Sequence, residues 1–183
     1  MPQTTNDSEL VSRAKKGDHG ALTQIYERYA AAIYRYIYFR VGEVELAEDL
    51  QAEVFLKMLE GIHRYEDRGW SISSWLYRIA HDRTIDTLRL RRNRKHIPLE
   101  SWGGSCDGPE ITVDAQLVYE ELFRMIAELT LPQRQVILLR FMADMSVQEV
   151  ARTLGRTEGA VKALQHRGLR SLAERLPADF MYS

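Results

Sequence analysis

The stretch from Trp70 to Lys95 combines aromatic, basic and hydrogen-bonding side chains on one predicted helix. From His81 to His96 the chain holds six lysines and arginines against two acids. Arginines bind phosphates and aromatic rings stack on unpaired bases, so this composition indicates a nucleic-acid contact. A solvated helix whose basic end complements the helix dipole is the alternative, and the stretch alone does not decide between the two.

A second stretch, from Ser146 to Arg175, has the pattern of a helix-turn-helix. Ser146 and Glu149 are spaced as a capping box, in which each side chain accepts the backbone N–H of the other residue. Gly155 supplies the turn, and Thr157 can cap the second helix. Five basic residues and two acids lie from Gly155 to Arg175, which favours contact with DNA over an ordinary αα-hairpin.

Residue types that carry catalysis or bind metals are sparse. The five histidines are scattered without metal-ligand spacing, and no glycine-rich phosphate loop is present. The single cysteine, Cys106, excludes an internal disulfide and fits a reducing cytoplasm. A redox-sensing role for Cys106 is a side hypothesis. We therefore expect no catalytic residue, no cofactor and no metal, and an enzyme is the least favoured class.

Length and composition are those of a small globular protein. The 183 residues suffice for one ordinary domain or two small ones, and 45% hydrophobic with 28% charged residues is typical of soluble proteins. The net charge of −1 excludes nothing about nucleic acid, because the charges are segregated along the chain. The start of the chain lacks the form of a signal peptide, and the run Ala30–Phe39 is too short to span a bilayer. We expect a soluble, cytoplasmic protein.

Helical periodicity dominates the chain, and no strand pattern of useful length occurs. Helices are predicted over Glu9–Lys16, Ala21–Val41 and Val44–Leu59, the second ending at Gly42. A polar loop, Gly61–Gly69, precedes the basic helix. Each helix has a predicted buried stripe. In Ala21–Val41 it is Ile25, Tyr29, Ala32, Ile33 and Tyr36, and in Val44–Leu59 it is Leu46, Leu50, Val54 and Met58. In the basic helix it is Ile72, Trp75, Leu76 and Ile79.

The segment Ile97–Asp114 has the composition of a linker, with glycines, prolines and four acids but no lysine or arginine. Helical periodicity resumes after it, and Pro132 sits where a first helical turn tolerates proline. The sequence therefore predicts an all-α protein of two small helical domains, residues 1–96 and 115–183, joined by a flexible acidic linker, residues 97–114. The apolar positions predicted after the linker are Val118, Leu122, Met125, Ile126 and Leu129.

Two sets of residue runs carry a family resemblance. The first set is Leu131–Phe141 and Ser146–Ala151, with Val161-Lys162 and His166-Arg167, and the second is Ala47–Leu50, Glu53–Leu56 and Trp75–Ala80. The first set resembles domain four, and the second domain two, of bacterial extracytoplasmic-function (ECF) sigma factors of RNA polymerase. The resemblance covers roughly Glu9 to Leu176, in the family's order. It implies a protein that binds core RNA polymerase and directs promoter-specific initiation through the −10 and −35 elements.

The resemblance also implies the role of each surface. The helix Val44–Leu59 would bind the coiled coil of the polymerase β′ subunit, and its acidic face suits a basic amphipathic partner. The loop from His63 to Trp70 would capture a flipped −10 base, which requires new stacking partners for that base. Tyr65 and Trp70 could supply them or could equally fill the core. The polymerase-binding residues implied are Asp49, Leu50, Glu53 and Phe55, and the −10 residues are Tyr65, Trp70, Tyr77, Arg78, His81, Asp82 and Arg89.

In domain four, the helix that begins near Thr157 would enter the major groove at the −35 element. Four positions depart from the family's usual pattern. Ala52 replaces a glutamine, Asp82 replaces an asparagine, and Ala163-Leu164 replaces Ser-Arg, which removes a phosphate contact. The −35 residues implied are Arg156, Thr157, Glu158, Lys162, Gln165, His166, Arg167 and Arg170.

Partners and alternatives follow from the same resemblance. The β and β′ subunits of core polymerase, promoter DNA and an anti-sigma factor are the implied partners, without direct membrane insertion. The acidic linker would run toward the RNA-exit path as a nucleic-acid mimic, or it is a plain solvated tether.

The competing function is a stand-alone helix-turn-helix regulator with an N-terminal partner-binding domain. Specific transcription with added core enzyme separates this regulator from a sigma factor.

Overall fold

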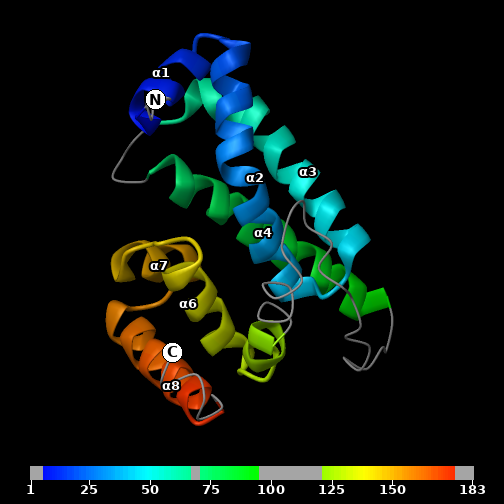
Figure 1. The fold of residues 1–183 in the computed structure, drawn as a ribbon, viewed down its shortest axis with the longest axis vertical. Helices are drawn as coiled ribbons and strands as arrows, with labels where there is room; N and C mark the ends of the chain where they lie inside the picture. Colours follow the sequence, from blue (N-terminus) through cyan, green and yellow to red (C-terminus); the bar gives the residue numbers. More distant parts are fainter. Residues whose placement is uncertain (1–5, 67–70, 95–120, 176–183) are drawn as a thin grey trace. The chain divides into compact units, whose positions relative to one another are not determined.

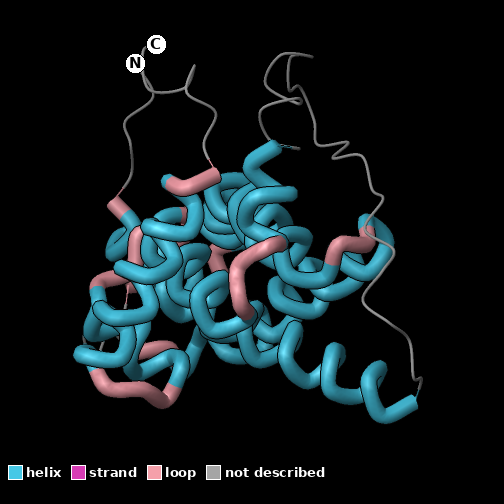
Figure 2. Tube along the Cα trace, turned by 90° about the horizontal axis from the view of Figure 1, so that it is seen from below, coloured by secondary structure: helices cyan, strands magenta, loops and turns pink. Residues whose placement is uncertain are grey.

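The structure is a computed structural model that describes residues 6–66, 71–94 and 121–175, with side chains up to 91 in the second range. Every regular element within these ranges is helical (Figure 2), as the sequence predicts. The chain divides into two compact units, Met1–Gly104 and Ser105–Ser183, here called the N-terminal and C-terminal units. The predicted linker 97–114 lies outside the described residues.

The N-terminal unit contains four α-helices and one 3₁₀ turn within its described residues (Figure 1). Helices α2, α3 and α4 pack pairwise on one another, and α1 packs on α2. Because only Gly42 and Glu43 join α2 to α3, these two long helices lie side by side and antiparallel. The elements are α1 (Asp7–Ala14), α2 (His19–Val41), α3 (Val44–Gly61), η1 (Ile62–Arg64) and α4 (Ile72–Arg94).

Short-range chemistry sets the ends of these helices. Asn6 caps α1 and Asp18 caps α2, each side chain accepting a backbone N–H of the first turn. Gly42 ends α2 with φ of 73°, a left-handed conformation that favours glycine. The core that these helices enclose follows the predicted stripes, although Tyr29, Ala32, Leu46, Trp75 and Ile79 are only half-buried. Its fully buried large side chains include Ile25, Ile33, Tyr36, Ile37, Leu50, Met58, Leu76 and Tyr77.

The C-terminal unit packs α8 against α6 and α7. Both predicted caps are confirmed: Ser146 and Glu149 form the reciprocal capping box, and the Thr157 hydroxyl accepts the N–H of Ala160 at 3.2 Å. Gly155 makes the turn with φ of 61°. Leu122, a predicted core position, is instead 41% exposed. The helices are residues 121–127, α6 (Leu131–Phe141), α7 (Val147–Leu154) and α8 (Glu158–Ala173).

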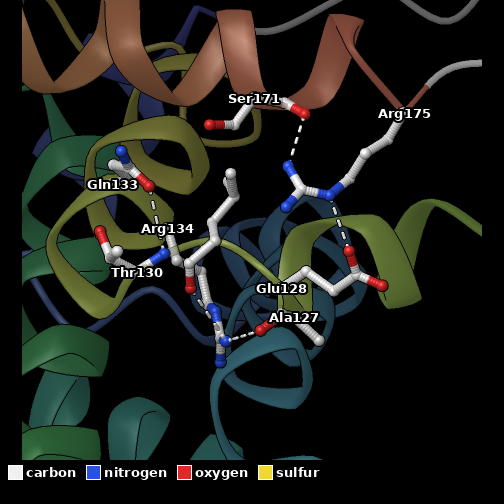
Figure 3. Close-up of polar contacts among 8 residues, drawn as sticks. Ala127, Glu128, Thr130, Gln133, Arg134, Ser171 and Arg175 are labelled. Atoms are coloured by element: carbon white, nitrogen blue, oxygen red, sulfur yellow. Dashed lines mark hydrogen bonds and ion pairs between the residues drawn. The ribbon is translucent and has the colours of Figure 1, made fainter.

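Arg134 joins the first two helices of this unit (Figure 3). Its side chain is 6% exposed and donates to the backbone carbonyls of Ile126, Ala127 and Leu129, where the preceding helix ends. The last carbonyls of a helix have no partner within it and carry partial negative charge, so a buried guanidinium is well placed there. Thr130 and Gln133 add a capping box at the start of α6.

Candidate nucleic-acid interface

The outer face of α3 is acidic and also exposes apolar surface. Asp49 and Glu53 are exposed, and within the described ranges neither forms an ion pair. Leu56 is 58% exposed. It follows Glu53 by three residues and Asp49 by seven, so the three side chains share one helix face. We call Asp49, Glu53 and Leu56 the α3 face.

Leu50 and Phe55 do not belong to the α3 face, although the resemblance implied both in polymerase binding. Leu50 is 1% exposed and Phe55 is 6% exposed. The Phe55 ring meets Tyr26 of α2 edge-on, at 4.8 Å between ring centroids. Both side chains therefore hold α3 in the core, and their part in polymerase binding stays a prediction. Leu56 is not among the residues predicted to bind polymerase. It lies on the side of α3 opposite the predicted buried stripe, which recurs every four residues from Leu46 to Met58.

The departure at Ala52 leaves the link between α3 and α2 intact. Ala52 is exposed, whereas the Gln51 amide donates to the Ala30 carbonyl of α2 at 2.7 Å. The polar interhelical contact thus exists one residue before the substituted position.

A buried polar cluster joins α2 to α4. Arg40 is 4% exposed, and its Nη1 donates to the Tyr36 hydroxyl at 2.9 Å and to Nδ1 of His81 at 2.9 Å. Because arginine only donates, Nδ1 of His81 must accept, and the imidazole proton lies on Nε2. Burial, with the nearby Arg40 charge, lowers the pKa of His81 from 6.5 to about 3. The ring is therefore neutral at physiological pH.

Tyr77 and His81, both expected at the −10 DNA, lie in the interior of the N-terminal unit. Tyr77 is 2% exposed and meets the Tyr36 ring edge-on at 5.3 Å, and burial raises its pKa to about 12. His81 is 7% exposed. Neither side chain lies on the surface of the unit, and their role at the −10 element stays a prediction. The buried side of α4 is wider than the apolar stripe indicated, because Tyr77, Ala80, His81 and Thr84 complete it.

The exposed side of α4 carries the remaining charged residues. Arg78, Asp82 and Arg89 are exposed and recur at intervals of four and seven residues, so they share one face. Desolvation raises the pKa of Asp82, and the Arg78 charge opposes that change. Arg91 instead forms an ion pair with Glu43 at the start of α3, with oxygens at 2.6 and 2.8 Å.

Tyr65 fills the core rather than offering an open aromatic face. Its side chain is 8% exposed, and its ring lies 5.0 Å from that of Trp75. Lys15, which follows α1, donates to the Tyr65 carbonyl at 2.8 Å, which fixes the entry to the predicted base-capture loop. Trp75 in turn packs closely on Gly61. Trp70, the other aromatic of the prediction, lies outside the described residues.

The outward side of α8 carries most of the residues predicted for the −35 element. Lys162 and His166 form no ion pair within the described ranges, whereas Arg170 pairs with Glu174 at 2.9 Å. Gln165 is half-buried at the edge of this surface. The exposed predicted residues, which we call the α8 face, are Arg156, Thr157, Glu158, Lys162, His166, Arg167 and Arg170.

These faces offer charge and hydrogen-bond donors. Within the described ranges, no group of three His, Cys, Asp or Glu side chains could hold a metal ion. No helix in the same ranges is long and apolar enough to cross a membrane.

Two sequence families match the two units. Residues 25–95 match Sigma-70 region 2, and residues 119–172 match Sigma-70, region 4. The chain is 36% identical to the ECF RNA polymerase sigma factor BldN of Streptomyces coelicolor, over 97% of this chain and 70% of that protein. It is 30% identical to the ECF RNA polymerase sigma factor SigD of Mycobacterium tuberculosis, over 95% of this chain and 85% of that protein.

Solved structures share the fold. CnrH, solved with the cytosolic domain of CnrY, has a TM-score of 0.69 at 23% identity, over 94% of this chain and 98% of that one. RpoE from Bartonella quintana, solved with the anti-sigma factor NepR, has a TM-score of 0.69 at 20% identity, over 83% of this chain and 94% of that one.

The chain belongs to the sigma-70 family, and within it to the ECF sigma factors. It is thus an alternative sigma factor that directs promoter-specific transcription.

Proposed function

We propose that the two units divide the work of initiation between them. The N-terminal unit docks on core RNA polymerase and engages the −10 element, and the C-terminal unit reads the −35 element. The observation that carries this proposal is a pair of faces of opposite charge. The α3 face is acidic and forms no ion pair with the residues that the structure describes, whereas the α8 face is mostly basic on the second helix of a helix-turn-helix.

The α3 face is the proposed docking surface for the polymerase β′ coiled coil. Asp49 and Glu53 supply charge that would orient a basic partner, and Leu56 supplies apolar area at the centre of the contact. Leu50 and Phe55 support this face from the core. The neighbouring Leu59 and Tyr26, which are 47% and 48% exposed, would extend the apolar area.

The exposed face of α4 is the proposed −10 surface. Arg78 and Arg89 would contact phosphates, while Asp82 could accept only from a base amino group, as on cytosine or adenine. Tyr77 and His81 act by position: they fill the space between α4 and α2. Lys15 and Trp75 hold Tyr65 at the start of the predicted base-capture loop.

The α8 face is the proposed −35 surface. In a helix-turn-helix the second helix lies in the major groove, with its N-terminal residues at the base edges. Lys162, His166 and Arg167 are exposed there. Ala163, also exposed, occupies the position where the family has serine, so one polar contact is absent from this surface.

The remaining partners follow from the same surfaces. The chain would act in the cytoplasm without catalysis of its own. The β and β′ subunits of core polymerase would be partners, and an anti-sigma factor would inhibit by covering the polymerase-binding faces. The acidic linker 97–114 would run toward the RNA-exit path.

Transcription with purified components tests this function. The chain is added to core RNA polymerase and a genomic DNA library, and the RNA start sites are sequenced. We expect start sites preceded by one shared pair of −10 and −35 sequences. A stand-alone regulator would bind an operator with the core enzyme inactive, and that result would contradict the proposal.

A further inference from the structure

Arg140 connects three parts of the C-terminal unit. It lies in the last turn of α6, and its Nη1 donates to the Met145 carbonyl, immediately before the cap of α7. Its Nε donates to Oε1 of Gln165 on α8 at 3.1 Å. One guanidinium therefore bonds both to the entry of the first helix of the helix-turn-helix and to the helix proposed to read DNA.

The spacing of α6 and α8 makes this contact possible. Gly168, one turn after Gln165, lies so close to α6 that an added Cβ would come within 3.0 Å of Ile137 Cγ1. The two helices approach closely only because this residue has no side chain. Arg140, one turn from Ile137 on the same helix, is thereby brought within reach of Gln165.

The hydrogen bond fixes what Gln165 can offer to DNA. Arginine has no acceptor atom, so the atom of Gln165 that faces Nε must be the carbonyl oxygen. The amide nitrogen makes no hydrogen bond within the described part of the chain. It is not buried there either, so it is open to solvent. Gln165 therefore presents its NH₂ group outward as a pure donor.

A donor-only glutamine has a different base preference from a free one. A free glutamine reads adenine with both amide atoms, accepting from N6 and donating to N7. Guanine presents two acceptors, N7 and O6, side by side in the major groove. We propose that Arg140 makes Gln165 a guanine-preferring residue at one position of the −35 element. This inference depends on the proposed role of α8 in −35 recognition.

The test uses the full chain with core RNA polymerase and a promoter library in which the −35 element is randomised. Gln165→Ala first identifies the base pair that Gln165 contacts, as the position whose preference it relaxes. At that position the unaltered chain should enrich guanine. Arg140→Met, which frees Oε1 and keeps the apolar stem, should lower the guanine-to-adenine ratio by about tenfold, within the range of one bidentate base contact.

A second variant covers the case in which Arg140→Met unfolds the unit. Gln165→Glu keeps an acceptor for Arg140 but removes the outward donor, so it should lose the guanine preference with the fold intact by circular dichroism. Two results would overturn the inference and leave −35 recognition standing. One is a Gln165→Ala protein with the same base preferences as the original chain at every −35 position. The other is enrichment of adenine by the original chain at the position that Gln165 contacts. Failure of the unaltered chain to enrich any −35 sequence would overturn the proposed function, and this inference with it.

Discussion

Arg40 of α2 donates a hydrogen bond of 2.9 Å to Nδ1 of His81 of α4, in the interior of the N-terminal unit. The contact determines the tautomer of the imidazole and keeps a cation next to it. A positive charge on His81 would be poorly solvated in the interior and would also be repelled by Arg40, which is why the pKa of His81 falls. The helix proposed to contact −10 DNA is thus attached to α2 through a neutral histidine.

This pair predicts a loss of stability in mild acid. The folded pKa of His81 is about 3, below its ordinary value of 6.5. Below pH 6.5 the unfolded chain binds a proton that the folded chain does not, so this group's stabilisation is complete above pH 6.5 and declines as the pH falls toward 3. Between pH 7 and pH 5 the free energy of unfolding should fall by about 2 kcal/mol through His81 alone.

Urea unfolding at a series of pH values measures this loss. His81→Gln, which keeps an acceptor for Arg40 but does not titrate, should lack this part of the pH dependence. The other four histidines remain in the variant and serve as the internal control. Equal pH dependence in the two proteins would contradict the account, because it would show that folding does not lower the pKa of His81.

The close approach of α6 and α8 predicts opposite effects of alanine at two glycines. Gly168→Ala places a methyl group against Ile137, so it should destabilise the C-terminal unit by about 1–3 kcal/mol. Gly159→Ala, where an added Cβ meets nothing within 4 Å, should leave stability unchanged or raise it by up to about 1 kcal/mol. Thermal unfolding followed by circular dichroism compares them. A Gly168→Ala protein as stable as the original would mean that α6 and α8 are not held at this spacing.

Substitutions at two leucines of α3 should have different effects, one on polymerase affinity and the other on stability. Leu56→Ala removes an exposed side chain, so it should weaken association with core polymerase and change stability by less than about 0.5 kcal/mol. Leu50→Ala opens a cavity in the core and should cost about 2–5 kcal/mol of stability. Fluorescence anisotropy with core enzyme and urea unfolding provide the two readouts. Unaltered polymerase affinity in Leu56→Ala would remove Leu56 from the proposed contact.

Helix positions were predictable because their signals are local. Glycines at 42 and 155, the Ser146–Glu149 capping box and the Thr157 cap each act within one turn, and all four were predicted from residue type and spacing. The Thr130–Gln133 box has the same kind of signal and was overlooked.

The site was less predictable because it depends on which helix faces meet. Tyr77 and His81 look like DNA-contacting residues by type, but contact with Tyr36 and Arg40, some forty residues earlier, places them inside. No spacing rule within α4 reveals that partnership. Leu56 could have been placed on the outer face of α3 from the buried stripe alone.

The division of labour between the two units is tested most directly with two paired variants of the full chain. Asp49→Ala with Glu53→Ala removes charge from the α3 face, and Lys162→Ala with Arg167→Ala removes it from the α8 face. Each is measured twice, by affinity for core polymerase and by affinity of the chain for −35 duplex DNA over a range of salt concentrations.

The first pair should weaken core association and leave DNA affinity unchanged. The second should leave core association unchanged and weaken DNA binding, with the slope of log affinity against log salt reduced by up to about 1.8 for two lost phosphate contacts. If both pairs affect both affinities equally, the proposed division between α3 and α8 is contradicted.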